Sequence, residues 1–325
     1  MSGSIKRILI SGAAGFIGSH LTRKLLQQGY EVGIIEHQDC QYCRIEDILD
    51  KLTDHTCDLR NTSGILDVVE NFRPDLIFHL ATYYTVEHKP DEIKTMVETN
   101  VLGTLNLLEA ARVFEIVYFV NTSSSFVYGQ KPHPAKENEE LNPLNLYALT
   151  KLQAEEACSF YAQRYGIKVV TFRLYPPYGP SDHERKLIPH AIKCFSTGAS
   201  LKLTTGKQRW DFIEVSNIIK AYIRLLEESC FPEGHAVFNI GTGKAVSIRE
   251  IVERIQLIMR VDYEPEWGVY PQRENEVMFL CGDIERARKH LAWQPEVTLS
   301  EGLETTINWF TQHFSKERSE SGKTD

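Results

Sequence analysis

The sequence predicts an α/β fold with a doubly wound parallel sheet, and two observations support this prediction. Through the first half, short apolar β-branched segments alternate with longer amphipathic segments, a pattern typical of β-α-β units with helices on both faces of a sheet. The strand candidates also lack polar alternation, as expected when both faces are buried. We predict strands at 7–11, 31–36, 76–80, 116–121 and 169–174, and helices at 19–28, 66–71, 98–112 and 147–165.

After Pro176 the alternation ends, and segments punctuated by proline and glycine follow. We interpret this part as a smaller mixed α/β region that binds a substrate. The predicted division assigns 1–175 and part of about 210–240 to the sheet domain, 176–209 and 241–314 to the substrate region, and 315–325 to a flexible polar tail. Helical periodicity in the second half predicts helices at 187–196, 215–228, 247–259, 283–291 and 300–314.

The composition favours a soluble enzyme over a nucleic-acid-binding or membrane protein. The 325 residues are 42% hydrophobic and 25% charged, and the net charge is −8. The basic residues are scattered, so we expect no nucleic-acid partner. No apolar stretch approaches the ~20 residues of a membrane span, and the N-terminus lacks a signal-peptide pattern. We therefore expect a cytoplasmic protein.

The seven cysteines are an odd number and are scattered along the chain, so we expect no structural disulfides. Cys40 and Cys43 form a C-x-x-C motif, but no second pair completes a tetrahedral zinc site. We therefore expect no bound metal and treat both as ordinary thiols.

A glycine-rich turn follows the first predicted strand. Residues 12–18 read Gly-Ala-Ala-Gly-Phe-Ile-Gly and lead directly into a helical pattern. Gly12 and Gly15 allow a tight turn and close approach of the backbone to a pyrophosphate, while Gly18 lets helix and strand pack closely. With Phe16 and Ile17 at the helix start, this turn predicts a Rossmann-type dinucleotide site.

The second predicted strand ends at Glu36, where an acid accepts hydrogen bonds from the hydroxyls of the adenosine ribose. A carboxylate there repels the additional phosphate of NADP(H). Glu36 therefore favours NAD as the cofactor, with NADP as the alternative.

The spacing G-x-x-G-x-x-G resembles that of the extended short-chain dehydrogenase/reductase family, also described as NAD-dependent epimerases and dehydratases. The segments Asp58-Leu59 and His79-Leu80-Ala81, and the N-x-x-G-T element that begins at Asn100, match further motifs of that family in order. This resemblance implies cofactor contacts from Asp58, Leu59, Leu80, Ala81, Thr82, Asn100 and Thr122, besides Tyr147 and Lys151.

The family's Y-x-x-x-K signature is present as Tyr147 and Lys151, preceded by a serine-rich strand end at 122–125. Positions four apart share one face of a helix, so the phenol and the ammonium point into one cleft. Lys151 and an oxidised nicotinamide favour the phenolate form of Tyr147, which then exchanges a proton with a hydroxyl group. The resemblance makes Ser124 the residue that holds the reacting oxygen, because it lies four residues before Tyr128-Gly129.

The two residues after Ser124 are informative about the reaction. Sugar 4,6-dehydratases of the family carry an Asp-Glu pair there, whereas this chain has Ser125 and Phe126. A dehydratase is therefore disfavoured. A simple oxidation or reduction remains, or a redox cycle that epimerises the carbon.

The second half resembles the family's substrate motifs with several departures. Pro176 stands where an asparagine is usual, Trp210 replaces an arginine that commonly meets the diphosphate, and Arg209 is its adjacent substitute. Arg273 and Glu276 resemble the late pair that meets phosphate and nucleoside ribose. The resemblance implies substrate contacts from Tyr83, Ser125, Phe126, Pro176, Leu187, Arg209, Trp210, Arg273 and Glu276.

The pattern as a whole resembles the branch that contains CDP-abequose and CDP-paratose synthases. It implies a cytoplasmic NAD(P)-dependent 4-ketoreductase of deoxysugar biosynthesis that acts at C4 of a nucleotide-diphosphate hexose. An NAD-retaining 4-epimerase remains open, and a cofactor-sensing regulator or a steroid or flavonoid reductase is less favoured. The segments 98–112 and 147–165 match the helices through which family members form dimers, so we expect a homodimer.

Overall fold

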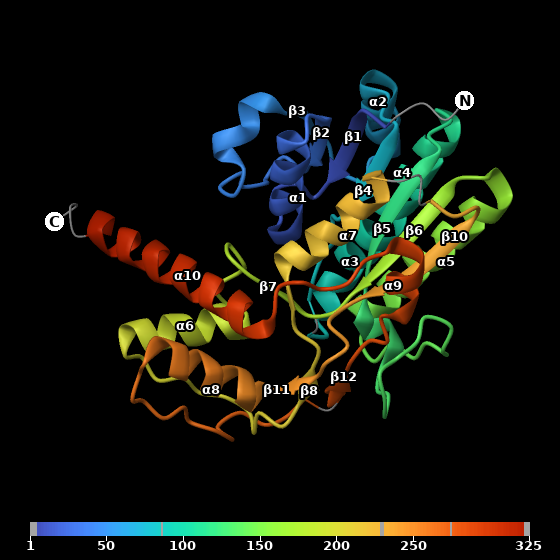
Figure 1. Cartoon of the computed structure of the whole chain (residues 1–325). Coiled ribbons are helices and arrows are strands. Elements are labelled where there is room, and N and C mark those ends of the chain that lie inside the picture. The colour runs from blue at the N-terminus through green and yellow to red at the C-terminus, as the bar shows by residue number, and fades with distance from the viewer. Residues whose placement is uncertain (1–4, 86, 228–230, 274, 322–325) are drawn as a thin grey trace.

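A seven-stranded parallel sheet forms the centre of the molecule (Figure 1). The computed structural model describes residues 5–85, 87–227, 231–273 and 275–321. The strand order is β10-β6-β5-β4-β1-β2-β3, and every neighbouring pair is parallel. The strands are β1 (Arg7–Ser11), β2 (Glu31–Glu36), β3 (Thr53–Thr56), β4 (Leu76–His79), β5 (Tyr118–Ser124), β6 (Lys168–Leu174) and β10 (His235–Ile240).

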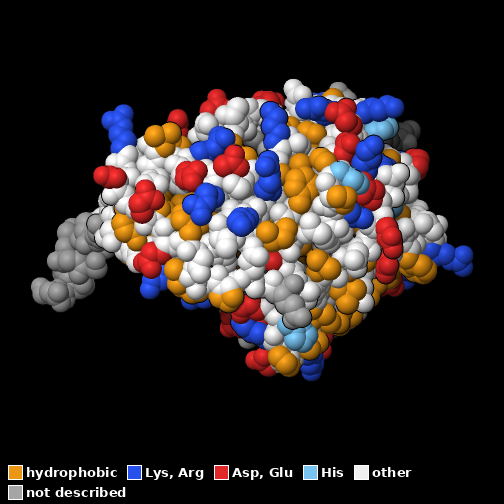
Figure 2. Space-filling model, turned by 90° about the horizontal axis from the view of Figure 1, so that it is seen from below, with side chains coloured by type: hydrophobic (Ala, Val, Ile, Leu, Met, Phe, Trp, Pro, Cys, Tyr) orange, Lys and Arg blue, Asp and Glu red, His pale blue; other side chains and the backbone are white. Residues whose placement is uncertain are grey.

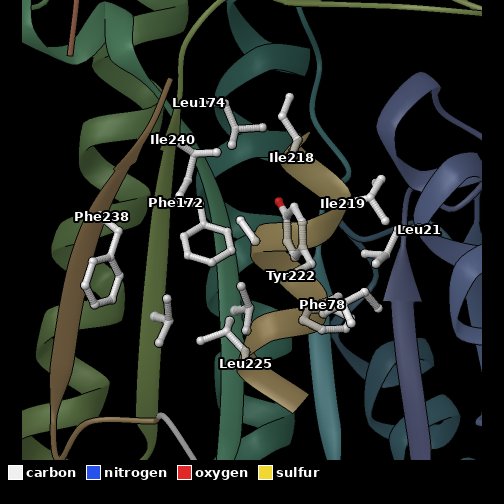
Figure 3. Packing of buried hydrophobic residues seen from close by; sticks show 14 of the residues in the cluster. Leu21, Phe78, Phe172, Leu174, Ile218, Ile219, Tyr222, Leu225, Phe238 and Ile240 are labelled. Atoms are coloured by element: carbon white, nitrogen blue, oxygen red, sulfur yellow. The ribbon is translucent and has the colours of Figure 1, made fainter. Parts of the chain in front are cut away.

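Helices cover both faces of this sheet, which confirms the predicted fold class. Alternate residues of β1 belong to different cores: Ile8 and Ile10 pack on one face, Leu9 on the other. Figure 3 shows the first core, in which Tyr222 lies between Phe78 and Phe172. One face carries α1 (Phe16–Gln27), α7 (Val215–Glu227) and α9 (Glu285–Leu291); the other carries α2 (Thr62–Phe72), α4 (Gly103–Val113) and α5 (Leu146–Tyr165).

The strand order reverses beside β1, and this reversal places the site. From β1 the chain proceeds outward through β2 and β3, then returns to β4 on the other side of β1. The connections after β1 and β4 therefore diverge, and a crevice opens at the carboxyl ends of the strands. Ser11 and His79 are paired neighbours at this edge.

The predicted helix at 98–112 is interrupted. The structure has α3 (Ile93–Val97), then a π-helical turn at Glu98–Leu102, and then α4. Such turns insert one extra residue per hydrogen-bonded ring and are frequent at functional sites. Here the turn contains Asn100, whose side chain is buried.

The substrate region lies beyond the carboxyl ends of the sheet (Figure 1). Apolar side chains of three helices form its core, which is separate from the two cores of the sheet. These helices are α6 (Leu187–Thr197), α8 (Ile248–Met259) and α10 (Leu299–Ser321). Two small sheets accompany them: β11 (Val246–Ser247), β8 (Arg209–Trp210) and β12 (Phe279–Leu280), and the pair β7 (Pro177–Tyr178) and β9 (Ile213–Glu214).

Two boundaries differ from the prediction. Helix α9 falls within the predicted substrate segment 241–314, but Ala287 and Leu291 bury their side chains in the core of the sheet domain. The predicted flexible tail at 315–325 is wrong for residues 315–321, which continue α10 because lysine, glutamate and arginine sustain a helix. Residues 228 and 322–325 lie outside the described part of the chain.

The predicted strands omitted two strands of the central sheet, β3 and β10. Strand β3 is short and exposed on three of its four residues, and its polar residues lack the apolar pattern that marks the other strands. Strand β10 lies in the second half of the chain, where the alternation of strand and helix patterns has ended. Among the described helices, none has both the length and the apolar character needed to cross a membrane.

Candidate functional site

A large cavity runs along the carboxyl ends of the strands and continues into the substrate region. Its volume of about 2630 Å³ exceeds the roughly 300–1,000 Å³ of a pocket for one small ligand. Residues of both regions line it, from the glycine turn at one end to Arg273 and Glu276 at the other. The cavity therefore has room for a dinucleotide and a second ligand together.

The glycine turn after β1, which we call the glycine cradle, brings backbone segments so close together that side chains would not fit between them. Gly12 has a positive φ of 78°, and a Cβ there would lie 2.7 Å from the backbone nitrogen of Ala81. A Cβ on Gly18 would lie 2.0 Å from the carbonyl oxygen of Gly12. Helix α1 begins at Phe16 without a side-chain cap, so its first N–H groups face the cavity as donors for an anion. Gly15, Phe16 and Ile17 line the same end.

Glu36 lies at the end of β2 and lines the cavity, as the sequence predicts. Its Oε1 accepts a hydrogen bond from the backbone N–H of Ala14, at 2.7 Å, and its Oε2 accepts one from the thiol of Cys40, at 3.4 Å. Burial raises the pKa of Glu36, and these two hydrogen bonds oppose the rise. Cys40 and the exposed Cys43 are free thiols, and the thiol of Cys40 supports the acid.

The remaining cofactor-side residues line the cavity between Glu36 and the catalytic group. The carboxylate of Asp58 is paired with Arg60, at 2.6 Å from Nη2. Leu59, Leu80, Ala81, Thr82 and Thr122 also line this part.

Tyr147 and Lys151 occupy one face of α5, which begins after Asn145 caps it by accepting from the Ala148 N–H at 2.8 Å. Burial raises the pKa of Tyr147, and the neighbouring Tyr84 adds to this rise, while the hydroxyl groups of Ser124 and Thr82 oppose it.

Burial also lowers the pKa of Lys151, to about 8. The negative charge of Glu155, one turn further along α5, opposes this change. Glu155 is itself paired with Arg173 at 2.6 Å and accepts a hydrogen bond from Ser123. Arg173 on β6 therefore supports the catalytic helix α5 through its ion pair with Glu155.

Asn100, which the sequence predicts as a cofactor contact, is buried and is not among the residues that line the cavity. Its cofactor contact stays a prediction. Its Oδ1 accepts from the Tyr83 N–H at 2.7 Å and the Thr82 hydroxyl at 3.1 Å. Its Nδ2 donates to the Tyr83 carbonyl and to Thr150 Oγ1, both at 3.0 Å, and Thr150 donates to the Tyr147 carbonyl at 2.8 Å. All four positions of the amide are used, so Asn100 ties the loop after β4 to the catalytic helix.

Two predicted substrate residues also lie outside the cavity. Ser125 is fully buried and begins the 3₁₀ turn that follows β5, whereas Ser124, the last residue of β5, lines the cavity. Arg209 is exposed and donates to the Ala245 carbonyl at 3.0 Å. The replacement of the arginine missing at Trp210 by Arg209 stays a prediction.

Aromatic side chains surround the catalytic tyrosine on the substrate side. The Tyr84 ring lies edge-on to Tyr147, at 4.9 Å between centroids, and Phe126 lies edge-on to Trp210 at 5.8 Å. Tyr83, Pro176, Leu187, Arg273 and Glu276 complete this part of the lining. Figure 2 shows the molecule from the side of the substrate region, where positive, negative and apolar side chains are interspersed.

A family model described as the NAD dependent epimerase/dehydratase family matches residues 8–241, which include both the glycine turn and the catalytic pair. The chain belongs to this family. The membership confirms the resemblance seen in the sequence and NAD as the cofactor of the enzyme. The glycine turn, the uncapped start of α1 and Glu36 all line the cavity, so the residues present fit NAD.

Members with different activities are similar to this chain over nearly its whole length. The CDP-abequose synthase of Salmonella typhimurium is 31% identical over 309 residues, which cover 92% of this chain and 97% of the relative. A UDP-glucose 4-epimerase of Thermotoga maritima with UDP-glucose has a TM-score of 0.88 at 27% identity, covering 95% and 99%. A UDP-glucose 4-epimerase of Thermus thermophilus in complex with NAD has a TM-score of 0.85 at 26% identity, covering 94% and 98%.

The sequence did not point to several charged residues of the cavity, among them Arg44, Asp182 and Lys186. None of these three belongs to a motif with fixed spacing. For Asp182 and Lys186 the sequence shows a charged run at 182–186, which follows Pro180 and Ser181.

Proposed function

We propose that this NAD-dependent enzyme acts at C4 of a nucleotide-diphosphate (deoxy)hexose as a 4-ketoreductase. The observation that carries the proposal is the catalytic group itself: Ser124, Tyr147 and Lys151 meet at the cavity, while Ser125 and Phe126 supply no acid or base beside them. Removal of water across two carbons requires such a pair. Transfer of a hydride and one proton does not.

The chain's own residues have separate roles in this reaction. Bound NADH supplies the hydride that reduces the C4 ketone. Ser124 donates a hydrogen bond to the ketone oxygen, and Tyr147 gives its hydroxyl proton to the same oxygen. The ammonium of Lys151 stabilises the phenolate that remains, and solvent returns the proton.

The aromatic surroundings support a sugar as the reacting group. Tyr84, Phe126 and Trp210 offer ring faces and edges against which a hexose ring packs, and Arg273 at the far end of the cavity offers a cation for a diphosphate. The similarity to a CDP-abequose synthase supports a deoxysugar. The substitutions at Pro176 and Trp210 separate this chain from the common diphosphate pattern of its family.

A nucleotide-sugar 4-epimerase that retains NAD is the second candidate. The observation that favours it is the buried Glu36, held by Ala14 and Cys40 where the cofactor's ribose binds. Such a carboxylate favours NAD, which an epimerase recycles in place. The two similar solved structures are epimerases by name.

The deciding experiment has two parts. Purified protein is denatured and its nucleotides are identified by mass spectrometry, and fresh protein is assayed with CDP- and dTDP-linked 4-keto-6-deoxyhexoses and NADH. The proposal expects stoichiometric oxidation of NADH and release of the 4-hydroxy sugar. Stoichiometric bound NAD with interconversion of two C4 epimers, and no net use of NADH, would identify the epimerase.

We further propose that the enzyme is a cytoplasmic homodimer. Apolar side chains are exposed on adjoining helices of one face, including Val97 on α3 and Leu149 and Phe160 on α5. Their burial against a second copy would remove this apolar surface from water. A sedimentation profile of a pure monomer at micromolar concentration would contradict the dimer.

A further inference from the structure

The segment 180–186, here named the strap, connects the substrate region to the cofactor side of the cavity. It follows β7 and precedes α6. The imidazole of His20 on α1 is hydrogen-bonded to the Pro180 carbonyl, with 2.9 Å between Nε2 and the oxygen. The Nε of Arg44 donates to the Ser181 carbonyl, also at 2.9 Å. The strap is therefore anchored at two backbone positions to residues of the sheet domain.

A third contact brings a cation to the glycine turn. The Nζ of Lys186 lies 5.2 Å from the ring centroid of Phe16, the first residue of α1. The same Nζ is 2.9 Å from Oδ1 of Asp182, which also accepts from the His183 N–H at 2.8 Å. Asp182 is buried, so it fixes the position of the ammonium while Lys186 itself lines the cavity.

Arg44 presents a second cation to the same space. Its backbone is fixed because Arg23 donates to its carbonyl at 2.7 Å, and its Nε is used by Ser181. Within the described part of the chain, neither of its terminal nitrogens donates a hydrogen bond to another residue. Arg44 lines the cavity, so these nitrogens are held in place as donors for a ligand.

We propose that Lys186 from the strap and Arg44 from the loop after β2 bind the pyrophosphate of NAD, on the side opposite the N–H groups at the start of α1. The inference rests on the proposed NAD site. A guanidinium offers two parallel donors that match phosphate oxygens, and an ammonium offers a point charge. Asp182 is a positioning residue for Lys186.

This arrangement has a consequence for cofactor exchange. A pyrophosphate held between α1 and the strap leaves only when Arg44 and Lys186 release it. The strap therefore slows the loss of NAD between turnovers, whichever direction the C4 chemistry takes.

The test compares adenosine ligands that carry different phosphates. Dissociation constants for adenosine, AMP, ADP, NAD and NADP are measured by calorimetry with wild type, Arg44→Gln, Lys186→Gln and the double variant. Lys24→Gln removes a cation from α1 away from the cavity and is the matched control. Each cavity variant is expected to weaken ADP and NAD about tenfold, leave adenosine within about twofold, and release NAD faster in a stopped-flow chase.

Each other result has a distinct meaning. Equal weakening of adenosine and ADP would show that the variants disturb the whole site, and the inference would be wrong. If Arg44→Gln lowered the affinity for NADP alone, Arg44 would bind the phosphate on the adenosine ribose and not the pyrophosphate. The inference would then also be wrong. Wild-type protein that binds no NAD would contradict the proposed cofactor site itself. Arg44→Lys, which keeps the charge, is expected to retain part of the ADP affinity. This variant distinguishes the loss of the positive charge from a folding defect in Arg44→Gln.

Discussion

Replacement of Asn100 by alanine tests whether this residue positions the catalytic group or contacts the cofactor. The variant removes the four hydrogen bonds of the amide, to Thr82, to both backbone groups of Tyr83 and to Thr150. At about 0.5–1.5 kcal/mol each, the free energy of unfolding falls by about 2–6 kcal/mol. A loss in the lower part of this range leaves the protein folded, because domains of this kind have about 5–15 kcal/mol of stability.

The catalytic consequence follows from the same contacts. Thr82 lies beside the hydroxyl of Tyr147, and Thr150 holds the Tyr147 carbonyl. Without Asn100, the loop that carries Thr82 and the helix that carries Tyr147 can move relative to each other. A misplacement of about 1 Å is expected to lower kcat by about 10²-fold. The affinity for NAD is expected to change less than about threefold.

The assay combines urea unfolding, kcat with the accepted sugar, and NAD binding by calorimetry. Asn217→Ala is the matched control, because its buried amide makes three hydrogen bonds to the chain at 296–297 and does not line the cavity. It is expected to lose stability and keep kcat. Unchanged stability of Asn100→Ala together with a tenfold loss of NAD affinity would refute the positioning role.

Three further predictions concern the catalytic pair and the glycine turn. Tyr147→Phe removes the proton donor and is expected to lower kcat by about 10²–10⁴-fold with unchanged NAD binding; equal activity in steady-state assays would contradict its role. Because burial lowers the pKa of Lys151 to about 8, its charge is lost as pH rises through that value, and kcat is expected to fall on the alkaline side near pH 8; a flat profile to pH 10 would count against it. Gly18→Ala places a Cβ 2.0 Å from the Gly12 carbonyl oxygen, so the turn must shift, and NAD affinity measured by calorimetry should fall by at least tenfold; wild-type affinity would show that the cradle tolerates a side chain.

Much of the fold and the centre of the site could be predicted from residue order, because local rules govern them. The alternation of apolar segments predicts a parallel sheet, and the structure confirms it. The glycine turn is a local requirement of the backbone, and Gly12 and Gly18 lie where no Cβ fits. The separation of Tyr147 and Lys151 by one helical turn is enough to place both on one face of α5.

Other features depend on contacts between distant parts of the chain. Of three successive serines, Ser123 and Ser124 line the cavity, Ser123 also bonds Glu155, and Ser125 is fully buried outside the lining. That order depends on how the end of β5 meets α5, which no local pattern encodes. The outward direction of Arg209 depends likewise on the pairing of β8 with its neighbours.

The sequence by itself determined the fold class, the cofactor turn and the catalytic pair, since each depends on spacing within one or two adjoining elements. Only the tertiary structure decided the role of Asn100, the return of α9 to the sheet domain and the approach of the strap to α1. These features join residues that lie far apart in sequence, such as Arg44 and Ser181. Their contacts arise only when the packing of whole elements brings them together, and hydrogen bonding then fixes where each side chain points.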